Sequence, residues 1–315
     1  MNARVTRHEF SSELVAAPRP ISAIAGENLD RIDAALARLT ACGVRIESDS
    51  RLHQAREIVA ESARGAGITP TQRGDDLGLR ALETALDYHT IASAAQPSFP
   101  ASVRRELRDS LRGGLKPPDG ALSPLQLQSQ AVAFAAFALA GCSPRYPPKS
   151  TGKSPDILLD RGTMTYAVEA KRPQTQNNIL THCRAGYEQV IASGHTGAVL
   201  VDVTDCVRGL GQNEVHAFVE RAGGELLDSV ATEDGRRPEY QNLIAVGCYA
   251  RVQAVAAETE KDAVLDLIMS ARIAVLANVR NSLEDHRARW IRDSHKRGMI
   301  AIYDPIAVQR PPAAT

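Results

Sequence analysis

Three charged residues stand where two short extended segments of the chain begin or end. Asp156 follows Pro155 at the start of the first segment, and Glu169 and Lys171 close the second, thirteen residues later. Glu169 and Lys171 are two positions apart, so a strand places both side chains on one face. Two carboxylates and one ammonium group are therefore expected at one end of a sheet. This set suits a hard divalent cation, because Mg²⁺ prefers oxygen ligands and keeps several of its waters.

Such a set can support hydrolysis of a phosphodiester. A metal held by the carboxylates can lower the pKa of a bound water and neutralise charge on the phosphorus centre. Lys171 can position that water or help to deprotonate it, and can offset developing negative charge. Glu169-Ala170-Lys171 is the only acidic-x-lysine tripeptide in a chain with six lysines. The alternative is a hairpin with a solvated Glu/Lys pair and no catalytic role.

The elements that must position these residues alternate between helices and strands. The hairpin strands are expected to meet at a turn over Asp160-Arg161-Gly162, and the apolar run that follows them suits a strand buried on both faces. This order predicts an α/β fold with a mixed β-sheet flanked by helices. The expected helices cover residues 125–140, 179–191 and 214–222, and the expected strands cover residues 155–159, 163–171, 197–205 and 242–252.

The segments SPDILL and AVEAKRP resemble the PD-(D/E)xK signature of the restriction-endonuclease-like nuclease superfamily. The core of that family is a helix, a three-stranded meander, a helix and a further strand, and the order expected from Leu125 to Asp205 is similar. The resemblance implies that Asp156, Glu169 and the backbone carbonyl of Ala170 bind Mg²⁺ or Mn²⁺. It also implies that Lys171 serves the attacking water, and that the products carry a 5′-phosphate and a 3′-hydroxyl.

Accessory positions follow from the same resemblance. Many family members carry a glutamate on the helix before the first strand, but that helix here has glutamines and no acid, and Gln130 is the position expected to be equivalent. A solvated helix end is the alternative for Gln130. Some relatives carry Gln-x-x-x-Tyr or a single glutamine on the helix after the lysine strand, which makes Tyr187 and Gln189 candidates. Tyr187 also lies on an apolar stripe, so core packing explains it as well.

Basic residues near the hairpin favour a polyanionic substrate. Arg145, Lys149 and Lys153 belong to one loop that leads into Asp156, where they can contact a phosphate backbone. Arg172 directly follows the candidate catalytic lysine, and it suits either a structural role or a phosphate contact at the strand end. The excess of arginine over lysine is compatible with phosphate recognition, but codon bias in a GC-rich genome is the preferred explanation.

Composition narrows the class of protein. The 315 residues carry a formal net charge of zero, and 43% are hydrophobic, so the chain is expected to fold rather than remain disordered. The most apolar stretch, residues 131–142, is shorter than the roughly 20 residues that cross a bilayer. The N-terminus has no apolar signal segment, and five scattered cysteines suit reduced thiols, so a cytoplasmic location is expected. The sequence has no phosphate-binding GxxxxGK[ST] loop, so nothing in it indicates an ATPase.

The domain organisation expected from these patterns has four parts. A helical N-terminal region (1–115) is followed by a Gly/Pro-rich linker (116–121), a nuclease core (122–255) and a C-terminal helical extension (256–315). Within the extension, residues 272–279 are an alternative strand. The expected helices of the first region cover residues 27–39, 54–63, 77–92 and 102–111.

The function expected from the sequence is that of a metal-dependent endonuclease that acts on DNA rather than RNA, in restriction, phage defence or repair. The helical N-terminal region would recruit substrate, a partner protein or a second copy of the chain. The alternative is a catalytically inactive module of the same fold that binds nucleic acid or a protein partner. The acid missing from the helix over 125–140 favours the inactive module, whereas the joint presence of Asp156, Glu169 and Lys171 favours the enzyme.

Overall fold

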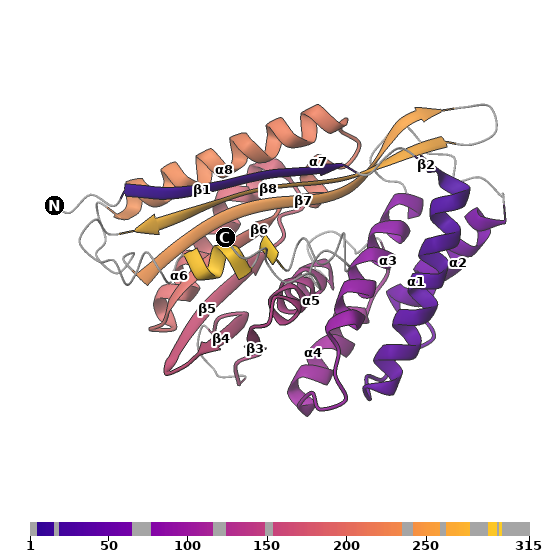
Figure 1. Cartoon of the computed structure of the whole chain (residues 1–315), viewed down its shortest axis with the longest axis horizontal. Helices are drawn as coiled ribbons and strands as arrows, with labels where there is room; N and C mark the ends of the chain where they lie inside the picture. Colours follow the sequence, from indigo (N-terminus) through magenta and orange to yellow (C-terminus); the bar gives the residue numbers. More distant parts are fainter. Residues whose placement is uncertain are drawn as a thin grey trace, which may run out of the picture.

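A mixed sheet with helices on both faces organises the chain (Figure 1). The computed structural model describes residues 5–15, 19–64, 77–115, 124–148, 154–234, 242–258, 263–277, 289–294 and 296–297. The α/β class and the mixed sheet expected from the sequence are confirmed. The helices are α1 (Ile21–Ala41), α2 (Arg51–Ala63), α3 (Leu77–Ala94), α4 (Ala101–Leu111), α5 (Pro124–Leu139), the 3₁₀ turn η1 (Gln176–Asn178), α6 (Ile179–Ala192), α7 (Thr204–Val207) and α8 (Gln212–Asp234).

The eight strands of the sheet run in the order β1-β8-β7-β6-β5-β4-β3, with β2 beside β8. Strands β5, β6 and β7 are parallel to one another, whereas the β3–β4, β4–β5, β7–β8 and β1–β8 pairs are antiparallel. The strands are β1 (Val5–Val15), β2 (Arg19–Pro20), β3 (Ser143–Arg145), β4 (Ile157–Arg161), β5 (Met164–Lys171), β6 (Thr196–Asp202), β7 (Leu243–Glu258) and β8 (Ala263–Ala277).

Two apolar cores cover the two faces of this sheet. Side chains of β4 and β5 alternate between them: Ile157 and Val168 pack with α5 and the N-terminal helices, whereas Leu158 and Ala167 pack with α6 and α8. Strand β6 contributes to both cores, which confirms the prediction of a strand buried on both faces. The first core runs without a break from α1 to the sheet, so the helical region and the strands share one interior.

Two parts of the expected organisation are wrong. The N-terminal region is not wholly helical, because residues 5–15 form β1, and the C-terminal extension is not helical over residues 263–277, which form β8. Strand β1 pairs along its whole length with residues 268–277 of β8. The strand alternative for residues 272–279 is therefore the correct one as far as β8 extends, to Ala277. The expected linker, residues 116–121, lies outside the described residues.

Candidate active site at the end of strand β5

The antiparallel pairing of β4 and β5 brings two carboxylates together. Ile157 is the partner of Val168, so Asp156 comes to lie beside Glu169. The backbone N–H of Asp156 donates to Glu169 Oε1 at 3.0 Å. In return, the backbone N–H of Ala170 donates to Asp156 Oδ2 at 3.0 Å. The two side chains are thus each held by the backbone of the opposite strand segment.

Lys171 completes this group from the same face of β5. Its Nζ lies 2.5 Å from Glu169 Oε2 and 3.4 Å from Asp156 Oδ2. Glu169 is fully buried and Lys171 is 9% exposed, so water screens the three charges poorly. The structure therefore brings together the three residues that the sequence pattern singled out.

The close approach of the two carboxylates changes how they titrate. Burial and the neighbouring charge of Asp156 raise the pKa of Glu169 to about 9, although Lys171 opposes the shift. For Lys171, burial alone lowers the pKa, but Asp156 and Glu169 outweigh it and the pKa is raised. At neutral pH the group thus combines a charged ammonium with a carboxyl that retains its proton. Burial and the charge of Asp156 keep this proton in place, and an added cation would offset the second of these causes.

Helix α5 contributes two glutamine side chains to the site. Gln126 and Gln130 are four residues apart and therefore share one face of the helix. Gln130 Nε2 donates to Asp156 Oδ1 at 2.7 Å, which places Gln130 where the sequence comparison expected an accessory group. Gln126 was not predicted: its Nε2 donates to the Ala170 carbonyl, and its Oε1 accepts the backbone N–H of Arg172 at 2.8 Å. Gln126 thus takes the place of a neighbouring strand beside the last residues of β5.

Helix α6 covers the opposite side of Glu169. Gly186 lies against the Cβ of Glu169, and a methyl group at this position would meet it at 3.5 Å. His182, one turn earlier on the same face, is half-buried, and burial together with the charge of Lys171 lowers its pKa. Sequence reasoning missed His182 because it considered only clusters of histidines.

The two accessory residues expected on α6 are not brought to the site. Tyr187 is fully buried in the core, and its hydroxyl donates to the Leu226 carbonyl at 3.3 Å. Its place in the apolar stripe therefore reflects packing, and the accessory role expected for it is wrong. Gln189 is partly exposed one turn beyond Gly186, and no hydrogen bond of its side chain to Asp156, Glu169 or Lys171 is among those of the described residues.

The basic residues expected to contact nucleic acid lie in different environments. Arg172 is 4% exposed and its Nε lies 2.7 Å from Asp205 Oδ2, so it is a buried structural residue and the expected phosphate contact is wrong. Arg145 is exposed, and its Nε lies 2.7 Å from Asp160 Oδ2 across the β3–β4 pair. Lys149 and Lys153 lie outside the described residues.

The donor set suits a single hard cation that retains other oxygen ligands. Among the described residues, no group of three or more His, Cys, Asp or Glu side chains could hold a metal ion. Asp156 and Glu169 could supply two carboxylates, and Gln130 meets Asp156 through its amide nitrogen rather than its oxygen. Mg²⁺ and Mn²⁺ accept such sets, in which water and substrate phosphate complete the coordination. The Ala170 carbonyl, an expected ligand, already accepts a hydrogen bond from Gln126.

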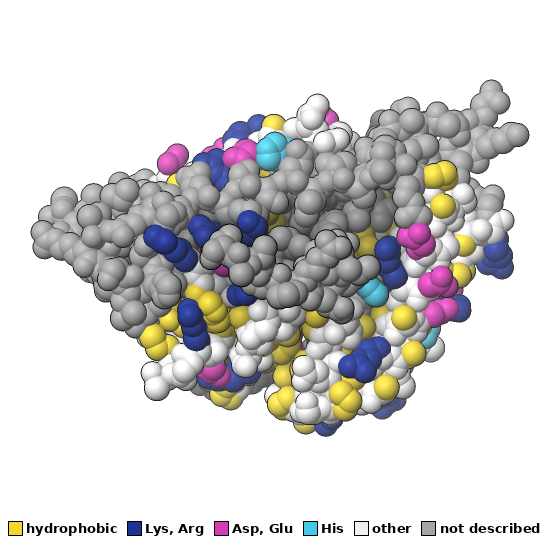
Figure 2. Space-filling model, in the orientation of Figure 1, with side chains coloured by type: hydrophobic (Ala, Val, Ile, Leu, Met, Phe, Trp, Pro, Cys, Tyr) yellow, Lys and Arg dark blue, Asp and Glu magenta, His cyan; other side chains and the backbone are white. Residues whose placement is uncertain are grey.

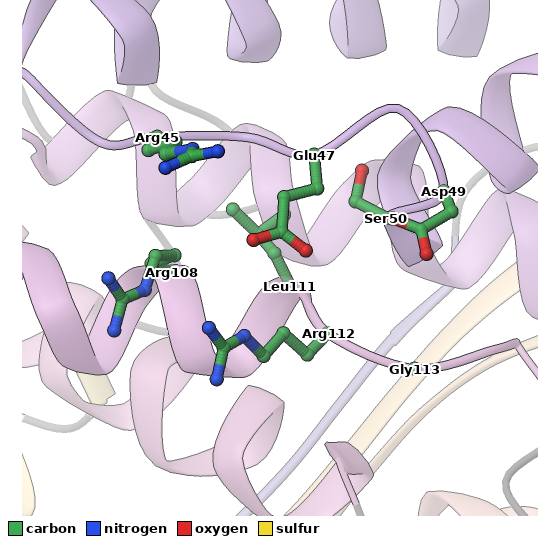
Figure 3. A pocket seen from close by; sticks show the side chains of 8 residues that line it. All are labelled: Arg45, Glu47, Asp49, Ser50, Arg108, Leu111, Arg112 and Gly113. Carbon is green, nitrogen blue, oxygen red and sulfur yellow. The ribbon is translucent and has the colours of Figure 1, made fainter.

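A surface pocket lies elsewhere, between the loop after α1 and the end of α4 (Figure 3). It has a volume of about 210 Å³, and none of the predicted site residues lines it. Guanidinium groups face the carboxylate of Glu47 there, so charges of both signs share the space. The lining residues are Arg45, Glu47, Asp49, Ser50, Arg108, Leu111, Arg112 and Gly113.

A short helical segment near the C-terminus covers residues 289–294, and basic side chains gather around it in the left half of Figure 2. Arg161 of β4 stacks on Trp290 with its guanidinium carbon 4.8 Å from the ring centroid, which ties this segment to the hairpin. Trp290 also packs against Tyr166 of β5. The segment therefore covers the end of β5 that is remote from Lys171.

Comparison with known proteins adds no family: no family model, no curated protein and no solved structure matches this chain. None of the helices in the described part of the chain combines the length and the apolar character needed to cross a membrane.

Proposed function

We propose that this protein is a Mg²⁺- or Mn²⁺-dependent nuclease that hydrolyses phosphodiester bonds, with DNA as its substrate. The observation that carries the proposal is the convergence of Asp156, Glu169 and Lys171 from two strands onto one buried point. The order α5-β3-β4-β5-α6-β6, with β3, β4, β5 and β6 adjacent in that order, supports a restriction-endonuclease-like core.

Each residue has a distinct part in this proposal. Asp156 and Glu169 would hold the metal, which when bound supplies Lewis-acid stabilisation of negative charge on the phosphate. Lys171 keeps a proton on Nζ at neutral pH, because both carboxylates raise its pKa. From there it can donate a hydrogen bond to the attacking water or to a phosphate oxygen. Gln130 holds Asp156 Oδ1 through its amide N–H and so limits the rotation of that carboxylate.

The experiment that tests the proposal supplies purified protein with plasmid, linear duplex, single-stranded DNA and RNA, in Mg²⁺, Mn²⁺ or EDTA. Cleavage is expected for DNA with either metal and not with EDTA, and end-labelling is expected to find 5′-phosphates. Lys171→Met keeps the aliphatic stem and is expected to lose cleavage. Lys296→Met, a lysine outside the site, is the matched control and is expected to retain it.

The same experiment distinguishes the alternative function. A catalytically inactive module would retard nucleic acid in a gel shift yet cut none of the four substrates with either metal. Cleavage that persists in Lys171→Met would assign the activity to a contaminant or to another site. Cleavage of RNA alone would keep the chemistry and change the substrate.

A further inference from the structure

Helix α3 carries an unusual set of charges for a helix that is buried along most of its length. Arg80, Glu83 and Asp87 are three and four residues apart, so they form one stripe on a helix whose other positions are mainly apolar. Glu83 and Asp87 are 7% and 4% exposed. Buried charges need specific partners, because their loss of hydration is otherwise uncompensated.

The partners of Asp87 lie on three elements around the candidate site. Its Oδ2 accepts Gln128 Nε2 of α5 at 2.7 Å, and its Oδ1 accepts Arg251 Nη1 of β7 at 2.6 Å. Arg172 Nη1, at the end of β5, lies 3.9 Å from Oδ2. Gln128 stands between Gln126 and Gln130 in the sequence of α5, and Arg172 follows Lys171 directly.

A second branch ties the same helix to the end of β5. Arg172 Nε lies 2.7 Å from Asp205 Oδ2, and Asp205 Oδ1 lies 2.7 Å from Arg208 Nη2. Arg208 Nη1 returns to Glu83 of α3 at 2.7 Å. Ion pairs therefore connect Glu83 and Asp87 of α3 to Arg172, the residue that follows Lys171, by two routes.

We propose that Asp87 is a positioning residue for the candidate active site. Through Gln128, on the side of α5 opposite to Gln126 and Gln130, it fixes the rotation of that helix about its axis. Through Arg172 it fixes the end of β5 that carries Lys171. This inference rests on the proposed nuclease function. It gives the N-terminal helical region a role inside the molecule, in shaping the site, in addition to any role in recruiting partners.

The test compares Asp87→Asn with Asp33→Asn, a matched control on α1. Asp33 also forms an ion pair, with Arg56 at 2.6 Å, but this pair is exposed and takes no part in the buried network. For duplex DNA and Mg²⁺, Asp87→Asn is expected to lower kcat at least tenfold while KM stays within twofold, because the substrate does not contact Asp87. Asp33→Asn is expected to match the wild type. A raised KM with unchanged kcat would overturn the inference.

A second readout needs no activity. The side-chain amide NMR signals of Gln126 and Gln130, assigned with Gln126→Ala and Gln130→Ala, report their contacts with Ala170 and Asp156. They are expected to shift in Asp87→Asn and to stay in place in Asp33→Asn; unmoved signals in Asp87→Asn would overturn the inference.

Gln128→Met cuts the link to α5 without removing a charge, so it replaces Asp87→Asn if that variant does not fold. The same shifts are expected in it, and unmoved signals would again overturn the inference. If the wild type neither cuts nucleic acid nor binds Mg²⁺, the proposed function fails, and the amide signals still decide the positioning role.

Discussion

The affinity of the candidate site for Mg²⁺ should depend steeply on pH, because Glu169 must lose a proton before it can bind a cation. Its pKa is about 9 without metal, mainly because of burial and of the charge of Asp156. Below that value most molecules carry the proton. The apparent dissociation constant for Mg²⁺ should then fall about tenfold for each pH unit gained, or about a hundredfold from pH 6.5 to pH 8.5.

The same shift fixes the sign of a stability effect. The folded protein holds the Glu169 proton up to about pH 9, whereas an unfolded chain releases it near the ordinary value of 4.5. In metal-free protein, this contribution to stability is present in full below pH 4.5 and is lost as the pH rises through 9. Lys171 is charged throughout, because its pKa is also raised.

Isothermal titration of Mg²⁺ at several pH values measures how the dissociation constant changes with pH. Repeating it in buffers with different ionisation enthalpies gives the number of protons released on binding. About one proton per ion is expected at pH 7. Glu169→Gln should bind Mg²⁺ weakly, with a dissociation constant that does not change with pH. Asp160→Asn is the control on the same hairpin, because hydrogen bonds from Arg145 and Thr165 lower the pKa of Asp160 and it is already ionised. A wild-type affinity that stays level from pH 6.5 to 8.5 would refute the reasoning.

Two further predictions concern helix α6. Gly186→Ala should destabilise the protein by about 1–3 kcal/mol in urea unfolding, because the added methyl would lie 2.9 Å from a side chain of β6. Gly26→Ala on α1, where an added methyl meets nothing within 4 Å, should instead gain about 0.5–1 kcal/mol, and equal losses at both positions would contradict the packing argument. Lys171→Met should raise the pKa of His182, measured from its imidazole NMR signals, because one of the two causes that lower it is removed. An unchanged His182 titration would show that Lys171 does not act on it.

Local sequence patterns predicted much of the fold and the three charged residues of the candidate site. The helices α2 to α6 and the β4–β5 hairpin follow from periodicity and turn residues, and Asp156, Glu169 and Lys171 follow from position along adjacent strands. Strand β1 was missed, and β8 was expected only as an alternative over residues 272–279, because the strand conformation of both depends on pairing within the sheet. Ala263–Ala277 is apolar enough to suit a helix or a strand, and its pairing decides between them: β7 lies on one side, and β1, more than 240 residues away in the sequence, lies on the other.

The second set of site residues escaped prediction for a different reason. Gln126 is no carboxylate, and its contribution is to complete the hydrogen bonds at the end of β5. The charges of α3 did carry a signal, since Arg80, Glu83 and Asp87 repeat at helical spacing in an apolar segment. Such a stripe on a buried helix indicates a charged partner, but the partners come from β5, β7 and the segment after β6, and their meeting depends on the sheet order.

The end of β5 contributes to both the candidate active site and the buried network of ion pairs. Side chains alternate along a strand, so Lys171 points to the face of α6 while Arg172 enters the buried network on the other side. Ala170, between Glu169 and Lys171, has both backbone groups bonded to side chains, those of Asp156 and Gln126. A disturbance of the network can therefore reach Lys171 through the backbone that it shares with Arg172, as well as through α5. A small displacement of that backbone would be enough to separate an ammonium from a carboxylate 2.5 Å away.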